Sequence, residues 1–222
     1  MSSLTATIPH PAKAAATESP IHELLSKRWS PCSFAGTPVA EQELNSLFEA
    51  ARWAASSYNE QPWTYFVATK AEPAEFEKLL SCLLPDNQAW TKAAPVLVLG
   101  VVNLNFSQQS GKENRAAVHD LGLASANLVV EATSRGLFVH QMIGIVPERA
   151  REIYRIPPGC EAWTAMAIGH KLDFGESTPA LQERDLAPRT RKPRGQFVFK
   201  GLWGQSAAGG SPKAPEPVTL AA

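Results

Sequence analysis

The sequence contains only three cysteines, Cys32, Cys82 and Cys160, and they lie far apart. It has no CxxC pair and no Cys/His cluster, so it supports neither a disulfide framework nor a zinc site. We expect reduced thiols in a reducing compartment. The chain also lacks an excess of either charge, with 21 Lys+Arg against 21 Asp+Glu. This balance removes the usual electrostatic argument for a nucleic acid or an anionic membrane as the main partner.

Targeting segments and the common catalytic motifs are missing as well. Residues 1–20 lack the apolar core of a secretory signal, and no run approaches the roughly 20 apolar residues of a membrane helix. We therefore expect a soluble, cytoplasmic protein. The sequence contains no GxSxG, HExxH, P-loop or GxGxxG motif. The sequence therefore gives no motif evidence for a serine hydrolase, a zinc metalloprotease or a nucleotide-binding protein of the P-loop or Rossmann type.

What is present is a chain of 222 residues, of which 44% are hydrophobic, enough to bury a core. Both ends are rich in alanine, proline and other small residues, which do not pack into a core. We therefore expect a disordered tail at 1–20 and a flexible tail at 205–222. Between them, residues 21–204 are predicted to form a single folded domain.

Apolar periodicity within that domain predicts helices mixed with strands. Residues 41–55 place Leu44, Leu47 and Ala51 on one face, as in an amphipathic helix. Residues 95–102 form an apolar run that is typical of a buried central strand. The pattern predicts an α+β domain with a central mixed or antiparallel sheet flanked by helices. Helices are predicted over 21–28, 41–55, 75–84, 116–136 and 149–154, and strands over 64–69, 95–102, 163–169 and 197–199.

Polar residues gather at the ends of these elements. Arg28 and Ser30 follow the first helix, where a guanidinium and a hydroxyl can hold a phosphate. On these residues alone, a basic helix end that complements the helix dipole is the more common explanation. The stretch 56–61 places two hydroxyls and two amides between a helix and a strand. Such groups suit the edge of a heterocycle, although they also stabilise loops through Asx and Ser turns.

Two later segments are further candidates. Residues 189–194 contain four cations, and an extended chain would place Arg189 and Arg191 on one side. They could clamp a phosphate or form a solvated basic segment; a nucleic-acid patch has the least support, because no aromatic residues are interleaved. After the helix at 116–136, His140 could contact a ligand, but a lone histidine is more often structural. Gly144 would let the backbone approach a flat ring.

Taken in order, these segments resemble the nitroreductase family of FMN-dependent oxidoreductases. The resemblance covers most of the 21–204 domain, and the Ser-Ser-x-Asn-x-Gln-Pro-Trp segment is its most specific part. The matching segments are Arg28-Trp29-Ser30-Pro31, Pro38-Val39, Glu49-Ala50-Ala51-Arg52-Trp53-Ala54, Ser56-Ser57-Tyr58-Asn59-Glu60-Gln61-Pro62-Trp63, Gly136-Leu137, His140-Gln141-Met142, Ile168-Gly169-His170 and Arg191-Lys192-Pro193 before Phe197-Val198-Phe199.

The resemblance implies a nitroreductase-like fold and a homodimer with two FMN sites at the subunit interface, each built from both chains. The helix at 116–136 would form the core of the dimer. The implied reaction is ping-pong: hydride passes from NADH or NADPH through flavin N5 to a small electron-poor acceptor such as a nitroaromatic or a quinone. Because the flavin carries this chemistry, no acid–base dyad is required.

The family pattern also implies which residues bind FMN. Arg28 and Ser30 would contact its phosphate and ribityl chain, and the late basic pair would close on the phosphate. The loop at 56–61 would border the flavin, partly from the other subunit, and the backbone at 143–144 would lie by the ring. The expected FMN-binding residues are Arg28, Trp29, Ser30, Cys32, Ser56, Ser57, Asn59, Gln61, Ile143, Gly144, Arg189 and Arg191.

Cys32 departs from the family pattern, which usually places Arg or Lys there, near the flavin N1/O2 edge. Loss of a charge-assisted contact worth roughly 1.5–3 kcal/mol would lower the flavin potential by tens of millivolts. Two alternatives stay open, and Cys32 bears on the second of them. One is a specialised biosynthetic flavin dehydrogenase or flavin-consuming enzyme of the same superfamily. The other is an FMN-binding protein without catalysis, which uses its Pro-rich C-terminal tail to recruit a partner.

Overall fold

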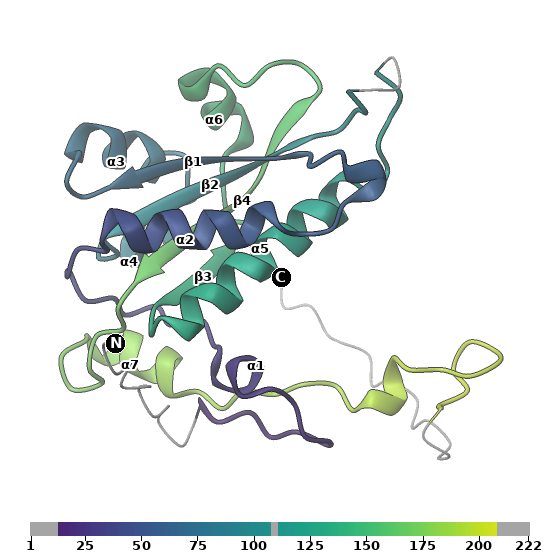
Figure 1. Cartoon of the computed structure of the whole chain (residues 1–222). Coiled ribbons are helices and arrows are strands. Elements are labelled where there is room, and N and C mark those ends of the chain that lie inside the picture. Colours follow the sequence, from purple (N-terminus) through teal and green to yellow (C-terminus); the bar gives the residue numbers. More distant parts are fainter. Residues whose placement is uncertain (1–12, 108–110, 208–222) are drawn as a thin grey trace.

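The computed structural model describes residues 13–107 and 111–207 of the chain. Most of both predicted tails, at 1–20 and 205–222, lies outside these residues. The described residues form a four-stranded sheet with helices on both faces (Figure 1). The strand order is β1-β2-β4-β3 and every neighbouring pair is antiparallel, so the predicted α+β class is confirmed. The strands are β1 (Trp63–Thr69), β2 (Val96–Asn103), β3 (Phe138–Met142) and β4 (Cys160–Gly169).

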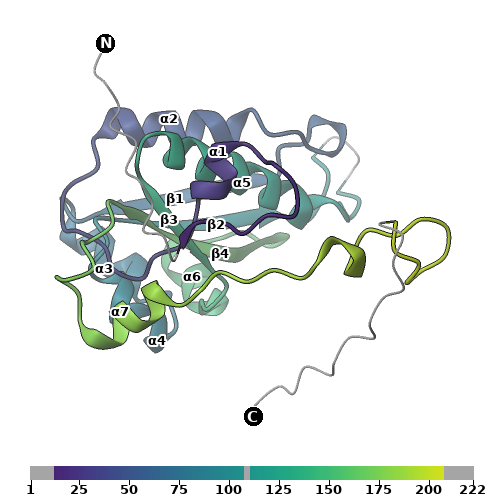
Figure 2. The same cartoon turned by 90° about the horizontal axis from the view of Figure 1, so that it is seen from below.

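The alternation of side chains along β2 explains why its sequence is apolar from Val96 to Val102. Val96 and Val98 belong to the core shared with helices α2 (Glu41–Arg52) and α5 (Ala117–Ser134), whereas Leu97 and Leu99 pack in the core on the other face. Figure 2 shows the three layers, with α2 and α5 on one side of the sheet. The remaining helices are α1 (Glu23–Lys27), α3 (Pro73–Leu80), α4 (Pro85–Thr91), α6 (Pro147–Tyr154), α7 (Pro179–Leu186) and the 3-10 turns η2 (Ser57–Asn59) and η3 (Arg194–Gln196).

Helix α5 is the long helix of small residues that the sequence predicts. One face, which includes Ala124 and Leu128, is buried against α2 and the sheet. The chain leaves the helix at Gly136, whose φ of 74° is the left-handed conformation that commonly closes helices. Although α5 is 18 residues long, neither it nor another described helix is apolar enough to span a membrane. The exposed face of α5 consists of His119, Gly122, Leu123, Ala126 and Asn127.

The strand predicted at 197–199 is wrong. The residues before it form the 3-10 turn η3, and Phe199 pairs only with Ser206, in an isolated bridge. Aromatic and β-branched residues favour a strand, but this segment runs away from the sheet and has no ladder to join (Figures 1 and 2). We call residues 187–207 the C-terminal arm. It carries exposed apolar side chains, among them Trp203, which is 94% exposed.

Besides the two 3-10 turns, the described residues contain three elements that the sequence analysis does not predict: β3, α4 and α7. The helix predicted at 75–84 ends at Leu80, and a separate helix begins at Pro85. Helices α3, α4, α6 and α7 all have proline in their first turn. Proline fits this position because it lacks an N–H that would otherwise be unpaired. These prolines are the signal that would have located α4 and α7.

Candidate functional site

Three arginines from opposite ends of the described chain, Arg28, Arg189 and Arg191, lie close enough for their charges to act on one another. Arg28 caps the end of α1, and its Nη1 donates to the Ser30 hydroxyl at 3.3 Å. Burial lowers the pKa of Arg28, and the positive charges of Arg189 and Arg191 lower it further. Within the described residues, none of these three arginines forms an ion pair with a carboxylate. We call Arg28, Ser30, Arg189 and Arg191 the arginine cluster; its uncompensated charge suits an anion.

Arg189 is held by two backbone carbonyls. Its Nη1 donates to Ser26 O at 2.7 Å and to Lys13 O at 2.8 Å. These two bonds account for both hydrogens of Nη1; as far as the described residues go, the Nη2 and Nε hydrogens remain for a ligand. Lys13 is itself buried, and its Nζ donates to Ala187 O at 2.6 Å. Arg191 instead donates to its neighbour Thr190 O at 2.7 Å.

Trp29, between Arg28 and Ser30, packs in the core next to the arginine cluster. Its ring is buried, meets Phe138 edge to face at 5.8 Å and stacks on Phe174 at 6.3 Å. The Lys13 ammonium lies 4.8 Å from the centre of the Trp29 ring. The indole therefore anchors the segment between Arg28 and Ser30 in the core.

The thiol of Cys32 is also turned inward. Cys32 is 4% exposed and belongs to the core on the face of the sheet opposite α2 and α5. Burial raises the pKa of this thiol to about 11, so it is neutral at pH 7. Its Sγ lies 3.8 Å from His140 Nδ1. A buried, protonated thiol is poorly suited to redox or nucleophilic chemistry.

His140 has a structural role in the described chain. Its Nδ1 lies 2.8 Å from Pro31 O, and because a carbonyl only accepts, Nδ1 carries the proton. The ring packs against Trp90 with centroids 4.5 Å apart. Burial lowers the pKa of His140, which keeps the imidazole neutral. This histidine therefore fastens the turn at Pro31 to strand β3.

The loop at 56–61 is strained. Tyr58, Asn59 and Gln61 have φ values of 54°, 55° and 53°, and they are three of the four non-glycine residues with positive φ in the described chain. Such conformations cost about 1–3 kcal/mol each and cluster at functional sites. The loop is braced internally, because Gln61 N donates to Ser56 Oγ at 3.0 Å and Gln61 Nε2 donates to Asn59 O at 3.0 Å.

A buried carboxylate holds this loop in place. Asp120, in the first turn of α5, is 2% exposed, and its Oδ2 accepts the Ser57 N–H at 2.9 Å. Its Oδ1 lies 3.2 Å from Nδ1 of the exposed His119. Sequence analysis misses Asp120 because a single acidic residue in a helix's first turn is common.

Ile143 and Gly144 follow β3 in a tight turn. The Ile145 N–H donates to Ile143 O at 2.8 Å, and the Ile143 side chain is 82% exposed. The Gly144 carbonyl accepts from Asn87 Nδ2 at 3.0 Å, and a Cβ at Gly144 would collide with that amide. A larger residue at position 144 would therefore displace the Asn87 amide from its bond to the Gly144 carbonyl. Asn87, on α4, is another residue that sequence analysis does not identify.

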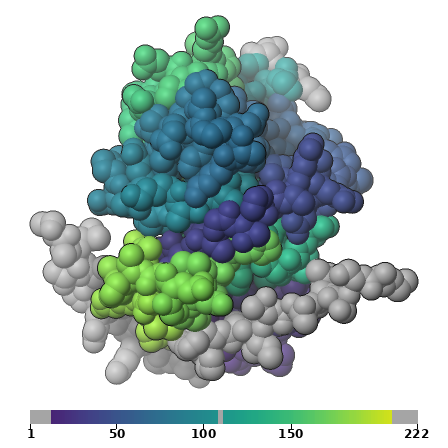
Figure 3. All heavy atoms as spheres, turned by 90° about the vertical axis from the view of Figure 1, so that its left-hand side faces the viewer, coloured from purple at the N-terminus to yellow at the C-terminus, as the bar shows by residue number. Residues whose placement is uncertain are grey.

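Within one chain, the predicted site residues fall into separate groups. The arginine cluster lies where the N-terminal segment meets the chain that follows α7. Figure 3 shows the yellow-green part of the chain around α7 packed against purple N-terminal residues. The strained loop at 56–61 lies at the far end of α2 (Figure 1). In a single chain, the residues predicted to bind a phosphate therefore lie apart from the loop predicted to border a flat ring.

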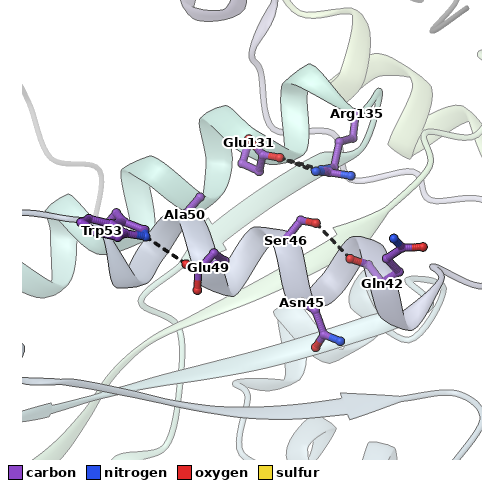
Figure 4. A pocket seen from close by; sticks show the side chains of 8 residues that line it. All are labelled: Gln42, Asn45, Ser46, Glu49, Ala50, Trp53, Glu131 and Arg135. Atoms are coloured by element: carbon purple, nitrogen blue, oxygen red, sulfur yellow. Dashed lines mark hydrogen bonds and ion pairs between the residues drawn. The ribbon is translucent and has the colours of Figure 1, made fainter. Parts of the chain in front are cut away.

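A surface groove between α2 and α5 is unrelated to these candidates (Figure 4). Four of its polar side chains are paired with one another: Trp53 Nε1 donates to Glu49 at 2.9 Å, and Arg135 Nε donates to Glu131 at 2.7 Å. None of the predicted site residues lines it. The groove therefore does not identify the site.

Comparisons with known proteins agree with the fold and with the sequence motifs. The sequence model of the nitroreductase family matches residues 25–170. A crystal structure of an oxidoreductase containing FMN is similar with a TM-score of 0.82 and 29% identity, covering 90% of this chain and 100% of that chain. A Polynucleobacter asymbioticus protein, provisionally named NADH dehydrogenase/NAD(P)H nitroreductase, is 30% identical over 174 residues, which cover 71% of this chain and 83% of that protein. An uncharacterised 15.4 kDa protein of Mycolicibacterium smegmatis is 34% identical over 125 residues, covering 56% and 82% respectively.

Proposed function

Because the chain belongs to the nitroreductase family of oxidoreductases, we propose that it binds FMN and reduces an electron-poor acceptor at the expense of NAD(P)H. The resemblance predicted from the sequence is thereby confirmed at the level of the family. The acceptor class that we propose comprises nitroaromatics and quinones. FMN, when bound, supplies a group that can take up a hydride from one substrate and deliver it to another.

The arginine cluster is the observation that carries this proposal. FMN differs from the uncharged flavins by a phosphate that is anionic at neutral pH. Three guanidinium groups that have no carboxylate partner among the described residues, one of them bonded to the Ser30 hydroxyl, match that group in charge and in hydrogen-bond donors. The residues present therefore fit the cofactor, with Arg28, Ser30, Arg189 and Arg191 holding its phosphate end.

The strained loop would serve the other end of the cofactor. Ser56, Ser57, Asn59 and Gln61 offer hydroxyls and amides, which can pair with the alternating carbonyl and N–H groups of a flavin edge. Rigid donors lose little freedom on binding, and Asp120 supplies that rigidity through the Ser57 N–H. At the turn after β3, the exposed Ile143 and the bare Gly144 backbone would flank the ring. These residues bind and orient the ring.

We further propose that the protein is a homodimer. Its strained loop and its arginine cluster lie apart in one chain, so a second copy is needed to bring one of each together. The exposed face of α5 is built from small and apolar residues, including Gly122, Leu123 and Ala126, which allow close approach of an identical helix. The exposed apolar side chains of the C-terminal arm would also be covered by a partner chain.

Reconstitution with FMN followed by turnover tests this proposal. Purified protein is incubated with FMN and dialysed, and its visible spectrum and its NADH or NADPH consumption with a nitroaromatic and with a quinone are recorded. We expect retained yellow flavin and consumption that depends on the acceptor. Protein that retains FMN but turns over neither acceptor would favour the specialised or the non-catalytic alternative. Protein that retains no FMN would contradict the proposal.

A further inference from the structure

A second buried carboxylate connects the two chain segments that carry the arginine cluster. Asp185, near the end of α7, is 3% exposed. Its Oδ1 accepts the Cys32 N–H at 2.7 Å, and its Oδ2 accepts the Ser33 N–H at 3.0 Å. Both oxygens of the carboxylate are thus used by consecutive backbone groups of the N-terminal segment. Such paired, charge-assisted bonds fix both distance and orientation.

These two bonds join the segments that carry the arginine cluster. Cys32 follows Arg28 and Ser30 directly in the chain, and Arg189 follows Asp185 just after α7 ends. The two segments are far apart in sequence, and the carboxylate joins them at a point two residues after Ser30 and four residues before Arg189. Two further hydrogen bonds, from Arg189 to Ser26 O and from Lys13 Nζ to Ala187 O, also join the N-terminal segment to the chain that follows α7.

We propose that Asp185 is a positioning residue that sets the separation between the two halves of the arginine cluster, and thereby makes the site select a phosphate-bearing ligand. This inference rests on the proposed function for the identity of that ligand as FMN. Asp185 itself would not bind the phosphate, because its side chain is 3% exposed and a carboxylate repels an anion. It acts through the placement of Arg28 and Arg189.

The local charges support a positioning role. Burial lowers the pKa of Lys13 and of Lys171, and the negative charge of Asp185 partly offsets that lowering. Within the described residues no ion pair joins Asp185 to Arg28 or Arg189, so the arginine cluster keeps its own charge for a ligand. A carboxylate that paired directly with Arg28 or Arg189 would instead cancel the attraction for phosphate.

Binding of two flavins to substituted proteins tests the proposal. FMN and riboflavin share the ring and the ribityl chain and differ only in the phosphate. The variants are Asp185→Ala, which removes both acceptors, and Asp185→Asn, which keeps one. The control is Glu183→Gln, which removes the same charge from an exposed position of the same helix. Dissociation constants are measured by quenching of flavin fluorescence.

We expect Asp185→Ala to weaken FMN binding by about tenfold or more, as the loss of a charge-assisted hydrogen bond would. Asp185→Asn should lie between that variant and the unmodified protein. Riboflavin binding should change less than about twofold in every variant, which also shows that the ring site stays folded. Equal losses for both flavins, or no loss for FMN, would overturn the proposal.

Inorganic phosphate separates this inference from the proposed function. Phosphate should raise the melting temperature of the unmodified protein and of Glu183→Gln, and not that of Asp185→Ala. If the unmodified protein binds neither flavin but shows this pattern, the proposed function fails and the role of Asp185 stands. If phosphate does not stabilise the unmodified protein, the arginine cluster is not a phosphate site and the inference fails.

Discussion

Removing the carboxylate of Asp120 should loosen the strained loop and lower the stability of the whole domain. Asp120 is 2% exposed and accepts the Ser57 N–H at 2.9 Å. Three residues of the adjoining loop adopt left-handed conformations, whose cost this bond helps to offset. Asp120→Ala deletes the acceptor and leaves the Ser57 N–H without its partner.

The expected loss follows from the type of bond. A hydrogen bond to a charged group contributes about 1.5–3 kcal/mol to stability. For a domain of this size, each kcal/mol shifts the melting temperature by about 2–4 °C. Asp120→Ala should therefore lower the melting temperature by about 3–12 °C. Asp120→Asn retains a neutral acceptor of roughly half the strength, so its loss should be about half as large.

Urea denaturation and thermal melting, each followed by circular dichroism, measure this loss. Glu113→Ala is the control, since it removes an exposed carboxylate that precedes α5. The reasoning is refuted if Asp120→Ala changes the free energy of unfolding by less than about 0.5 kcal/mol, the range of ordinary surface substitutions. It is also refuted if Glu113→Ala costs as much.

Three shorter predictions concern the interface, pH and the flavin potential. Leu123→Glu on the exposed face of α5 should convert a dimer into a folded monomer in sedimentation experiments, and an unchanged dimer would exclude this face as the interface. The pKa of His140 is lowered in the folded chain, so the unfolded chain binds a proton at this histidine more readily. The free energy of unfolding should therefore decrease as the pH falls below about 6.5. His140→Gln should show a smaller drop in denaturation midpoint between pH 7.5 and 5.5, and an equal drop would contradict this role. Because the Cys32 thiol is buried and neutral, Cys32→Ser should leave the midpoint potential of bound flavin unchanged; a shift above about 30 mV, equivalent to 1.4 kcal/mol, would show that the thiol acts on the flavin.

The elements that the sequence predicts well are those whose apolar pattern has a single explanation. Residues 95–102 are apolar at every position because both faces of β2 are covered. Helices α2 and α5 are long enough for the helical period to stand out. Strand β3 is only five residues long and includes the polar pair His140 and Gln141, so its pattern is weak. It becomes a strand by pairing with β4.

The groups that organise the candidate site are harder to predict than the groups that would touch a ligand. Asp185 meets Cys32 across 153 positions of sequence, and Asp120 meets Ser57 across 63. No local pattern encodes such distant pairs. Burial is equally hard to predict. Trp29 and Cys32 stand among arginine, serine and proline, which are usually exposed, and yet both side chains are buried in the core.

Anaerobic titration of the FMN-loaded protein tests the central claim most directly. Addition of NADH or NADPH should bleach the visible flavin absorbance, and later addition of a nitroaromatic or a quinone should restore it without oxygen. Each half of the exchange is then observed separately, at a stoichiometry of one flavin for each chain. Protein that stays colourless after FMN is added, or whose bound flavin neither nicotinamide reduces, would contradict the account.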